Sequence, residues 1–406
     1  MATFLVAQPD RADHAAREVS IEALRAIRTH LGMDVAFISE FTDGQRVFRQ
    51  LDAASQCCPV YVGGAQPLEE SYCQRVVDGR LPELIHDASK IPAAMELPVT
   101  AALPVGAHLS VPIRLQDGRV YGTFCCFSYA PDHSLNDRDI AMMRVFADLT
   151  AAQIERELES EHIKLEAADR LRAIIAGEGL AMAFQPVIDV GNGKPIGFEA
   201  LARFSGTPPR GPDAWFAEAA GVGLGVELEV TAVRLAVADL PRLPPHAYLA
   251  INVSPLTVVS GQLDTLLAEV PAQRIVLEVT EHAAIETYEQ LQAALKVLRG
   301  RGMRLAVDDA GAGYASFRHI LRLRPDIIKL DMALTRDIDR DPARRALASA
   351  LITFAGSTGS TIVAEGVETA GELHALRRLG VTTAQGYYLG RPTPLPDFRD
   401  AALAVG

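Results

Sequence analysis

Arg304-Leu-Ala-Val-Asp-Asp-Ala-Gly-Ala-Gly-Tyr-Ala315 is the stretch around which the rest of the sequence is organised. Its apolar run ends at two adjacent carboxylates, Asp308 and Asp309, and a glycine-rich turn follows. An uninterrupted apolar run of this kind is typical of a parallel strand that is buried on both faces. Two adjacent acids at the end of a buried strand repel each other and lose hydration, so they need cations nearby. On its own, the stretch is equally compatible with an aspartate pair that caps the next helix.

The C-terminal half contains more runs of this kind, and they alternate with helical stretches in the pattern of strand–helix repeats. The runs are Met182–Ile188, Ile196–Leu201, Ala247–Asn252, Arg274–Glu278, Leu305–Asp308, Ile327–Leu330, Thr361–Glu365 and Thr383–Gly386. Eight strands within about 230 residues match the size of an α/β TIM-like barrel. The first two runs are joined by Gly191-Asn-Gly-Lys194, which is a hairpin signal. We therefore expect a barrel in which one strand runs antiparallel to its neighbour.

Polar side chains stand late in most of these runs, where a barrel strand delivers residues to the catalytic face. They are Glu199, Asn252, Glu278, Asp308, Lys329, Glu365 and Gln385. One lysine cannot compensate so many buried acids, whereas divalent cations can. Carboxylate and amide oxygens without histidine or cysteine suit Mg²⁺ or Mn²⁺ better than zinc. Because a pair of such ions polarises a phosphate and activates water, the pattern favours phosphodiester hydrolysis.

The N-terminal part has a different pattern. Residues 12–32 have the apolar spacing of a helix, and two pairs of strands follow, each joined by a turn. The first pair, 35–41 and 45–51, flanks Thr42-Asp43-Gly44, and the second, 107–115 and 120–128, flanks Gln116-Asp117-Gly118. A short helix is expected at Tyr72–Val77. Together these elements predict an α+β sensory module with one antiparallel sheet.

A connector helix is predicted over residues 135–177, because no proline or glycine interrupts the chain before Gly177. The apolar residues Ala151, Ile154, Leu158, Leu165 and Ala168 fit the two seam positions of a heptad, although Glu161 breaks the pattern. The pattern favours the seam of a parallel homodimer. A long connector exposed to solvent remains the alternative.

Composition places the chain among ordinary globular proteins, with 49% hydrophobic and 22% charged residues. The formal charge of -12 argues against nucleic acid or an anionic membrane as a general partner. Neither the N-terminus nor any apolar run has the length of a signal peptide or a membrane span. Five cysteines without metal-type spacing suggest a reducing compartment. We expect a cytoplasmic protein without membrane insertion.

The N-terminal elements resemble a GAF domain, through Gly106-Ala-His-Leu-Ser-Val-Pro-Ile113, the turn Asp117-Gly118 and Tyr121-Gly-Thr-Phe-Cys-Cys-Phe-Ser128. The resemblance implies a sensory domain over residues 1–155 that recognises an unknown small ligand or signal. Cys73 is the cysteine to consider for chromophore attachment. No tetrapyrrole-type motif surrounds Cys73, which favours a structural role.

The C-terminal half resembles the EAL domain, the cyclic di-GMP phosphodiesterase family, over a domain of residues 168–406. Phe198-Glu-Ala-Leu-Ala-Arg203 carries the family signature. The further matches, in family order, are Asn252-Val-Ser254, Glu278-Val-Thr-Glu281, Asp308-Asp-Ala-Gly-Ala-Gly-Tyr314, Lys329-Leu-Asp331, Ala364-Glu-Gly-Val-Glu368 and Gln385-Gly-Tyr-Tyr-Leu-Gly390. The resemblance implies hydrolysis of cyclic di-GMP to linear pGpG with two Mg²⁺ or Mn²⁺ ions per active site, inhibited by Ca²⁺.

The resemblance also implies a role for each matching residue. The first metal ion would be held by Glu199, Asn252, Glu278 and Asp308, and the second by Asp308 and Asp309. Lys329 would orient the attacking water, Glu365 would take its proton or help to hold it, and Gln385 would lie beside it. Substrate contacts would come from Gln185 and Arg203. The glycine-rich loop would be braced by Glu281, with Glu368 as a supporting acid. Ala310 stands where the family usually has phenylalanine, which leaves the ordering of this loop open.

The function expected from these features is a cyclic di-GMP phosphodiesterase that the GAF domain regulates. The main alternative is a catalytically inactive cyclic di-GMP receptor, but such relatives should lack metal ligands or the lysine, and none is missing here. A third hypothesis is that the chain is a scaffold whose barrel only binds partner proteins. A homodimer is expected for the connector and, by resemblance, for the barrel.

Overall fold

The structure is a computed structural model that describes residues 21–55, 60–279, 288–310 and 314–395. The chain divides into two compact units, Met1–Ile163 and Lys164–Gly406. A single helix, α5 (Asp137–Ile175), continues from the first unit into the second. Each unit has a sheet and a hydrophobic core of its own.

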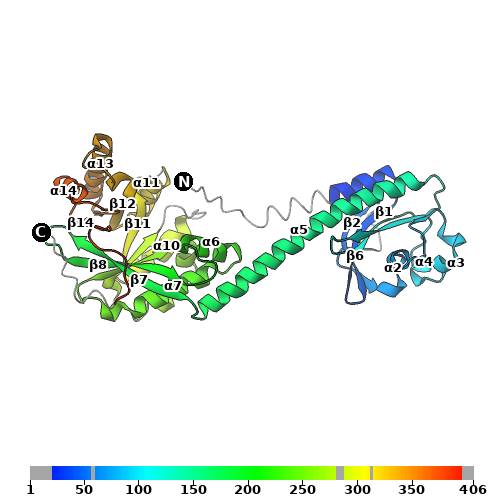
Figure 1. The fold of residues 1–406 in the computed structure, drawn as a ribbon, viewed down its shortest axis with the longest axis horizontal. Helices are drawn as coiled ribbons and strands as arrows, with labels where there is room; N and C mark the ends of the chain where they lie inside the picture. Colours follow the sequence, from blue (N-terminus) through cyan, green and yellow to red (C-terminus); the bar gives the residue numbers. More distant parts are fainter. Residues whose placement is uncertain (1–20, 56–59, 280–287, 311–313, 396–406) are drawn as a thin grey trace. The chain divides into compact units, whose positions relative to one another are not determined.

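The N-terminal unit is built on a six-stranded antiparallel sheet with the strand order β3-β2-β1-β6-β5-β4. Strands β1, β2 and β6 of this sheet are labelled in Figure 1. Its strands are β1 (Val35–Thr42), β2 (Gln45–Ala53), β3 (Ala65–Pro67), β4 (Leu84–Ile85), β5 (His108–Arg114) and β6 (Val120–Phe127). Its helices include one at 21–30, α2 (Tyr72–Val77), α3 (Pro92–Met95) and α4 (Pro98–Ala102). Both predicted hairpins are confirmed, because β1 pairs with β2 and β5 pairs with β6.

Hydrophobic residues cover both faces of this sheet. One face packs against the helix at 21–30 and the first part of α5, which contributes Met143. The other face packs against α2 and the short helices that follow it, with Tyr72 from α2 and Ala94 from α3. Because neighbouring residues in a strand point to opposite faces, Cys125 belongs to the second core and Cys126 to the first.

Helix α5 has 39 residues. Among the predicted seam positions, Ala151 and Ala168 are buried, whereas Leu158 and Leu165 are 38% and 62% exposed. The dimer seam stays a prediction, and these two leucines are its exposed members. No helix in the described ranges is both long and apolar enough to cross a membrane.

Eight strands close into a barrel in the C-terminal unit, in the order β10-β11-β12-β13-β14-β7-β8-β9, which agrees with the predicted TIM-like fold. The strands are β7 (Leu180–Asp189), β8 (Pro195–Phe204), β9 (Tyr248–Val253), β10 (Ile275–Val279), β11 (Arg304–Ala310), β12 (Ile327–Leu330), β13 (Thr361–Ala364) and β14 (Thr383–Ala384). Strand β7 pairs antiparallel with both of its neighbours, β8 and β14, and the other pairs of neighbouring strands are parallel.

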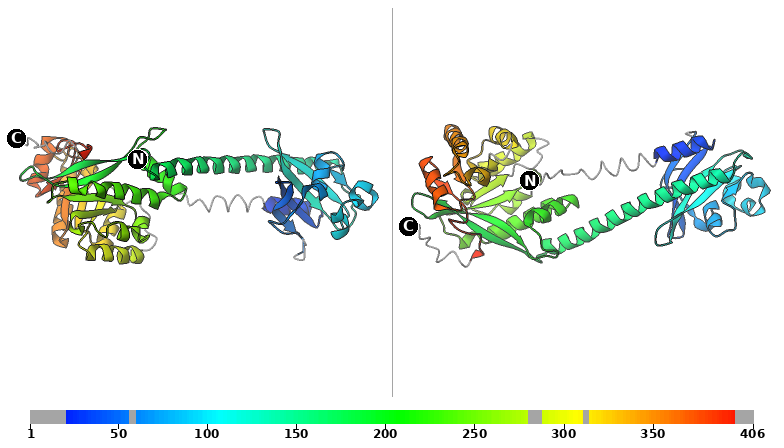
Figure 2. Two further views of the ribbon diagram at one scale, coloured as in Figure 1. Left: turned by 90° about the horizontal axis from the view of Figure 1, so that it is seen from below. Right: turned by 45° about the horizontal axis from the view of Figure 1, so that its top comes forward.

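Helices pack around the outside of the barrel (Figure 2). They are α6 (Pro212–Gly221), α7 (Gly225–Ala238), α8 (Pro255–Val259), α9 (Gln262–Leu266), α10 (Tyr288–Gly300), α11 (Tyr314–Leu323), α12 (Met332–Thr335), α13 (Pro342–Thr358) and α14 (Ala370–Arg378). Alternate strand residues such as Ile251, Leu277 and Val307 face these helices and form the main core. The residues between them point into the barrel, where Ala250, Val276 and others form a smaller core of their own.

Candidate active site

The period of two along each strand explains why the polar residues gather inside the barrel. Five of them stand two residues beyond a member of the interior core, on the same face of the strand. The pairs are Ala250 and Asn252, Val276 and Glu278, Ala306 and Asp308, Ile327 and Lys329, and Val363 and Glu365. Gln185 precedes Val187 instead, because β7 runs in the opposite direction. The carboxyl ends of the parallel strands therefore deliver these side chains to one end of the barrel.

Two glycines allow close approaches that support this arrangement. A side chain at Gly197, two residues before Glu199, would stand 2.4 Å from the ring of Tyr248 inside the barrel. A side chain at Gly386 would stand 2.2 Å from the backbone of Val367. Glycine at 386 therefore lets the loop after β14 close against the loop after β13, which carries Glu365.

Lys329 is the centre of the site. Its side chain is 2% exposed, and its ammonium lies 2.8 Å from Glu278 Oε2 and 2.8 Å from Glu365 Oε1. Asp308 Oδ1 lies 3.3 Å from the same nitrogen, and Glu199 Oε2 lies 3.5 Å from it. The barrel thus brings together four carboxylates that are far apart in the sequence. When all four are ionised they exceed the single ammonium by three negative charges.

The surplus of negative charge is one cause of the shifted pKa values of Glu278, Glu365 and Lys329. Burial is the main cause that raises the pKa of Glu278 well above its usual value, with further contributions from the charges of Glu199 and Asp308 that Lys329 only partly offsets. Burial likewise raises the pKa of Glu365 well above its usual value. Burial alone would lower the pKa of Lys329, but the surrounding carboxylates outweigh it and keep the amine protonated. The site is therefore short of positive charge.

A chain of amide contacts orients Glu199. Its Oε1 accepts a hydrogen bond from Asn252 Nδ2 at 3.0 Å, and its Oε2 accepts one from Gln385 Nε2 at 2.7 Å. The same Gln385 nitrogen lies 3.0 Å from Gln185 Oε1, and Gln185 donates to the carbonyl of Gly390 at 3.0 Å. The Oε1 atom of Gln385 is buried and has no hydrogen-bond partner among the described residues.

The remaining predicted residues lie further out or outside the described ranges. Arg203 is exposed, donates to the carbonyl of Ala202 at 2.8 Å and lines the same cavity as Glu199. Glu368 pairs with Arg336 at 3.1 Å, and both side chains are partly exposed. Asp309 belongs to β11, but its side chain and the whole of Glu281 fall outside the described part of the chain.

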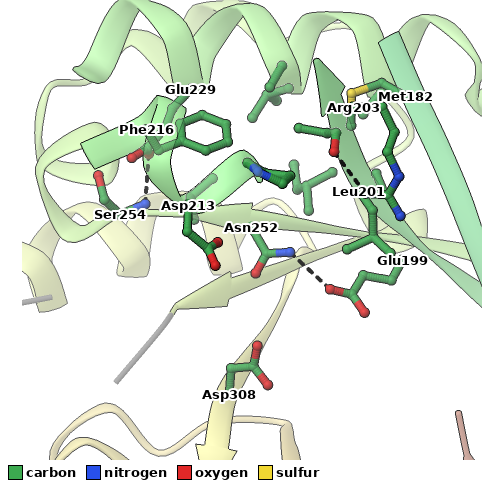
Figure 3. Close-up of a pocket in the computed structure, with 18 residues that line it drawn as sticks. Met182, Glu199, Leu201, Arg203, Asp213, Phe216, Glu229, Asn252, Ser254 and Asp308 are labelled. Atoms are coloured by element: carbon green, nitrogen blue, oxygen red, sulfur yellow. Dashed lines mark hydrogen bonds between the residues drawn. The ribbon is translucent and has the colours of Figure 1, made fainter. Parts of the chain in front are cut away.

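A cavity of about 450 Å³ opens beside Glu199, Asn252 and Asp308 (Figure 3). Helices α6 and α7 add Asp213, Phe216 and Glu229 to its lining. Figure 3 shows the carboxylate of Asp213 on the same side as the amide of Asn252. Sequence reasoning missed these three residues, because it searched only strand ends. The backbone N–H of Ser254 donates to Glu229 at 2.8 Å, which ties α7 to the motif that follows Asn252.

Glu372 is a further residue that sequence reasoning missed. It is 4% exposed, and its carboxylate accepts hydrogen bonds from the backbone N–H groups of Asp337, Glu368 and Thr369 at 2.9 to 3.0 Å. It also forms a capping box with Thr369 at the start of α14. Glu372 thus holds the segment after Glu365 through three backbone donors, and the supporting role of Glu368 stays a prediction. The spacing Thr369-Ala-Gly-Glu372 is that of a capping box and could have predicted this helix start from the sequence.

The donor set fits hard divalent cations by its chemistry. It consists of carboxylate and amide oxygens, it carries surplus negative charge, and it includes the unpartnered oxygen of Gln385. In the described residues, no three His, Cys, Asp or Glu side chains converge closely enough to enclose one ion as they stand. The carboxylates converge on Lys329 instead.

Comparison with known proteins identifies the family. A model described as EAL domain matches residues 168–392, and one described as GAF domain matches residues 13–155. The chain therefore belongs to the EAL domain family and carries a GAF domain in its N-terminal part.

Three relatives illustrate how far the similarity extends. An uncharacterized protein of Azorhizobium caulinodans is 32% identical over 61% of this chain and 35% of its own length. Cyclic di-GMP phosphodiesterase NbdA of Pseudomonas aeruginosa is 31% identical over 57% of this chain and 31% of its own. The solved structure of the EAL enzyme Bd1971 is 16% identical, with a TM-score of 0.56 over 90% of this chain and 92% of that one, and supports the fold alone. The chain spans about a third of the length of the curated relatives it matches.

Proposed function

We propose that this chain hydrolyses cyclic di-GMP to linear 5'-pGpG with two divalent ions, Mg²⁺ or Mn²⁺. The observation that carries the proposal is the cluster of four carboxylates around one buried ammonium beside a cavity. Such a surplus of negative charge needs cations, and cations next to an open cavity suit a phosphodiester. Membership of the EAL family and the name of NbdA point to cyclic di-GMP as the substrate.

Bound divalent ions would polarise the phosphate and lower the pKa of the attacking water. In this proposal Glu199, Asn252, Glu278 and Asp308 hold one ion, and Asp308 and Asp309 hold the other. The hydrogen bonds from Asn252 and Gln385 fix the direction of the Glu199 carboxylate before any ion arrives. This preorganisation lowers the cost of binding a cation.

The other residues handle the water and the substrate. Lys329 orients the water and offsets phosphate charge, and Glu365 accepts a proton. Glu365 Oε1 lies 2.8 Å from the ammonium of Lys329, so the proposed proton acceptor stands next to the group that orients the water. Gln385 offers its unpartnered Oε1 to the water. Arg203 stands exposed at the cavity, where its guanidinium can reach a phosphate oxygen, and Gln185 completes the substrate contacts.

Turnover by the purified full chain tests the proposal. With Mg²⁺ or Mn²⁺, chromatography should show loss of cyclic di-GMP and gain of pGpG. Glu199→Gln should reduce kcat by more than about 1,000-fold, since metal ions contribute several kcal/mol to such reactions. Glu227→Gln, at an exposed acid on α7, is the matched control. Binding of cyclic di-GMP without any pGpG from the wild type would instead establish the inactive receptor.

Regulation by the GAF domain and assembly as a homodimer are parts of the same proposal. The exposed apolar residues of α5 support the dimer. Removal of residues 1–150 should change the hydrolysis rate or its metal dependence, whereas identical rates would refute regulation by this domain.

A further inference from the structure

A buried polar cluster lies in the core of the N-terminal unit, on the face of the sheet that α2 covers. It contains Arg46 from β2, Cys73 from α2 and Cys125 from β6, which are 4%, 0% and 0% exposed. Ser110 and Thr123 belong to the same cluster. Polar groups at this depth must satisfy one another, because water does not reach them.

The charge of Arg46 has an unusual partner. No carboxylate of the described residues lies within ion-pair distance of its guanidinium, which rests on the rings of Phe48 and Phe37 at 4.5 and 5.6 Å. One terminal nitrogen donates to Gln66, and the other donates to Cys73 Sγ at 3.3 Å. A buried guanidinium needs an anion beside it. The thiol of Cys73 is the acid in contact with it.

The pKa values of Cys73 and of the groups around it support a thiolate at Cys73. Burial alone would raise the pKa of Cys73, but the hydrogen bond with Cys125 and the charge of Arg46 outweigh it, and the pKa falls well below its usual value. Burial and the hydrogen bond with Cys73 raise the pKa of Cys125. Burial, helped by the charge of Arg46, lowers the pKa of His108 to about 3, so this imidazole stays neutral. Arg46 is left as the cation that faces the thiolate.

Cys125 is placed to react with Cys73. The two sulfur atoms lie 3.5 Å apart, and Cys125 is held by Ser110 at 3.0 Å and Thr123 at 3.1 Å. We propose that Cys73 and Cys125 are a redox-active pair, in which Cys73 reacts with a hydroperoxide and Cys125 resolves the product to a disulfide. The inference concerns the N-terminal unit and does not depend on the proposed function of the barrel.

The reaction balances with hydrogen peroxide as the oxidant. The Cys73 thiolate attacks one peroxide oxygen, the O–O bond breaks, and hydroxide leaves. Cys73 is thereby oxidised by two electrons to a sulfenic acid, and the peroxide is reduced. The sulfur of Cys125 then attacks the sulfur of Cys73, the S–O bond breaks, and the departing hydroxide takes the Cys125 proton to form water.

The disulfide requires only a small movement. A disulfide bond is about 2.05 Å long, so the sulfur atoms must approach by about 1.5 Å from their separation of 3.5 Å. Cys73 lies on α2, which has six residues. Complete burial restricts the reaction to a small oxidant and excludes bulky disulfides such as oxidised glutathione.

Cys126 supplies a matched control. It is also 0% exposed and is the next residue in the same strand, but it points to the opposite core. Burial raises the pKa of Cys126, so it should remain an unreactive thiol. The full chain would be treated with hydrogen peroxide, digested and analysed by mass spectrometry. The wild type and Cys126→Ser should form the Cys73–Cys125 disulfide, and Cys73→Ser should not. Cys125→Ser should give a sulfenic acid at Cys73 that dimedone traps when the oxidised protein is unfolded in its presence.

The pH profile distinguishes a thiolate from a merely neighbouring thiol. The charged and titratable groups that contact Cys73 are Arg46 from β2 and Cys125 from β6, and His108 from β5 interacts with Arg46 as a neutral imidazole. Oxidation of wild-type Cys73 should change less than about twofold between pH 8 and pH 6, whereas a thiol with an ordinary pKa would slow about 75-fold. Arg46→Met should restore the steep profile. A steep wild-type profile, or oxidation of Cys126 as fast as of Cys73 in folded protein, would overturn the inference.

Discussion

Replacement of Lys329 by methionine tests the electrostatic basis of the site. The substitution keeps a long side chain but removes the cation that lies within 3.5 Å of four carboxylates. Breaking a buried ion pair by removing one partner costs about 3–5 kcal/mol of stability. With a urea m-value of about 3 kcal/mol/M, the midpoint of unfolding should fall by about 1 to 1.7 M in the presence of EDTA.

The assay is urea unfolding of the full chain followed by tryptophan fluorescence. Trp215 is the single tryptophan of the sequence, lies in the barrel unit and is 0% exposed, so its emission reports on the barrel even when the N-terminal unit is present. Lys194→Met, at an exposed lysine in the β7–β8 turn, is the control and should leave the midpoint unchanged.

Unfolding with Mn²⁺ and at different pH values tests whether the loss of stability in Lys329→Met is electrostatic. At 100 times its dissociation constant a ligand stabilises a fold by about 2.7 kcal/mol. The variant carries more uncompensated negative charge than the wild type and should bind Mn²⁺ more tightly, so Mn²⁺ should raise the midpoint of Lys329→Met further and narrow the gap between the two proteins. The raised pKa values of Glu278 and Glu365 mean that the folded state binds protons that the unfolded state has released above pH 4.5. Metal-free stability should therefore fall as pH rises above 4.5, by up to about 1.4 kcal/mol per unit and proton, and more steeply in the variant. An unchanged midpoint in EDTA, or a loss that neither Mn²⁺ nor low pH reduces, would refute the reasoning.

Three further predictions follow from the same structure. Glu372→Gln should lower the free energy of unfolding by about 1–3 kcal/mol, because three backbone donors lose a charged acceptor. Burial alone would raise the pKa of Glu372, but these donors lower it in the folded state. The carboxylate therefore contributes to the free energy of unfolding above pH 4.5, and this contribution is lost as pH falls through the lowered pKa of the folded state. A pH dependence of stability in the variant that matches the wild type would contradict this. Leu165→Glu should shift sedimentation of the full chain from dimer to monomer if α5 forms the seam, whereas Glu159→Gln, at an exposed position outside the seam, should not. Excess Ca²⁺ should suppress the Mn²⁺-dependent hydrolysis, since Ca²⁺ prefers longer bonds and more ligands, and undiminished turnover would contradict the expected ion preference.

The barrel could be predicted because its strands carry two signals at once. Each interior position must be apolar for packing, and the position two residues later must be polar to reach the open end, as in Ile327 and Lys329. The predicted strand ends differ from the observed ones by a few residues at most, as with β7, which extends beyond Met182–Ile188 to Leu180–Asp189. The turn at Asp43 and Gly44 was also readable, because both residues have positive φ, 49° and 72°, in the hairpin.

The features that were missed depend on which way side chains point in the tertiary structure and on which distant residues meet there. Asp213 and Glu229 lie on helices, and a helical pattern alone does not say which of its polar residues face a cavity and which face solvent. Cys73 and Cys125 are 52 positions apart and come from different elements, so only the fold places their sulfur atoms together. The prediction of a structural role for Cys73 rested on its sequence neighbours, and these do not include Arg46 or Cys125, which contact Cys73 only in the folded structure.

The choice between enzyme and receptor depends on whether Lys329 and a cation can occupy the site together. The ion pairs of Lys329 engage one oxygen of each carboxylate, Oε2 of Glu199 and Glu278, Oδ1 of Asp308 and Oε1 of Glu365. A carboxylate can accept several partners through its two oxygens, so ammonium and cation need not exclude each other. If they share the site, Mn²⁺ raises the unfolding midpoint of the wild type as well as that of Lys329→Met, as the hydrolytic mechanism requires. If Mn²⁺ stabilises only the variant, the ammonium keeps the cation out of the natural protein, and the receptor reading prevails.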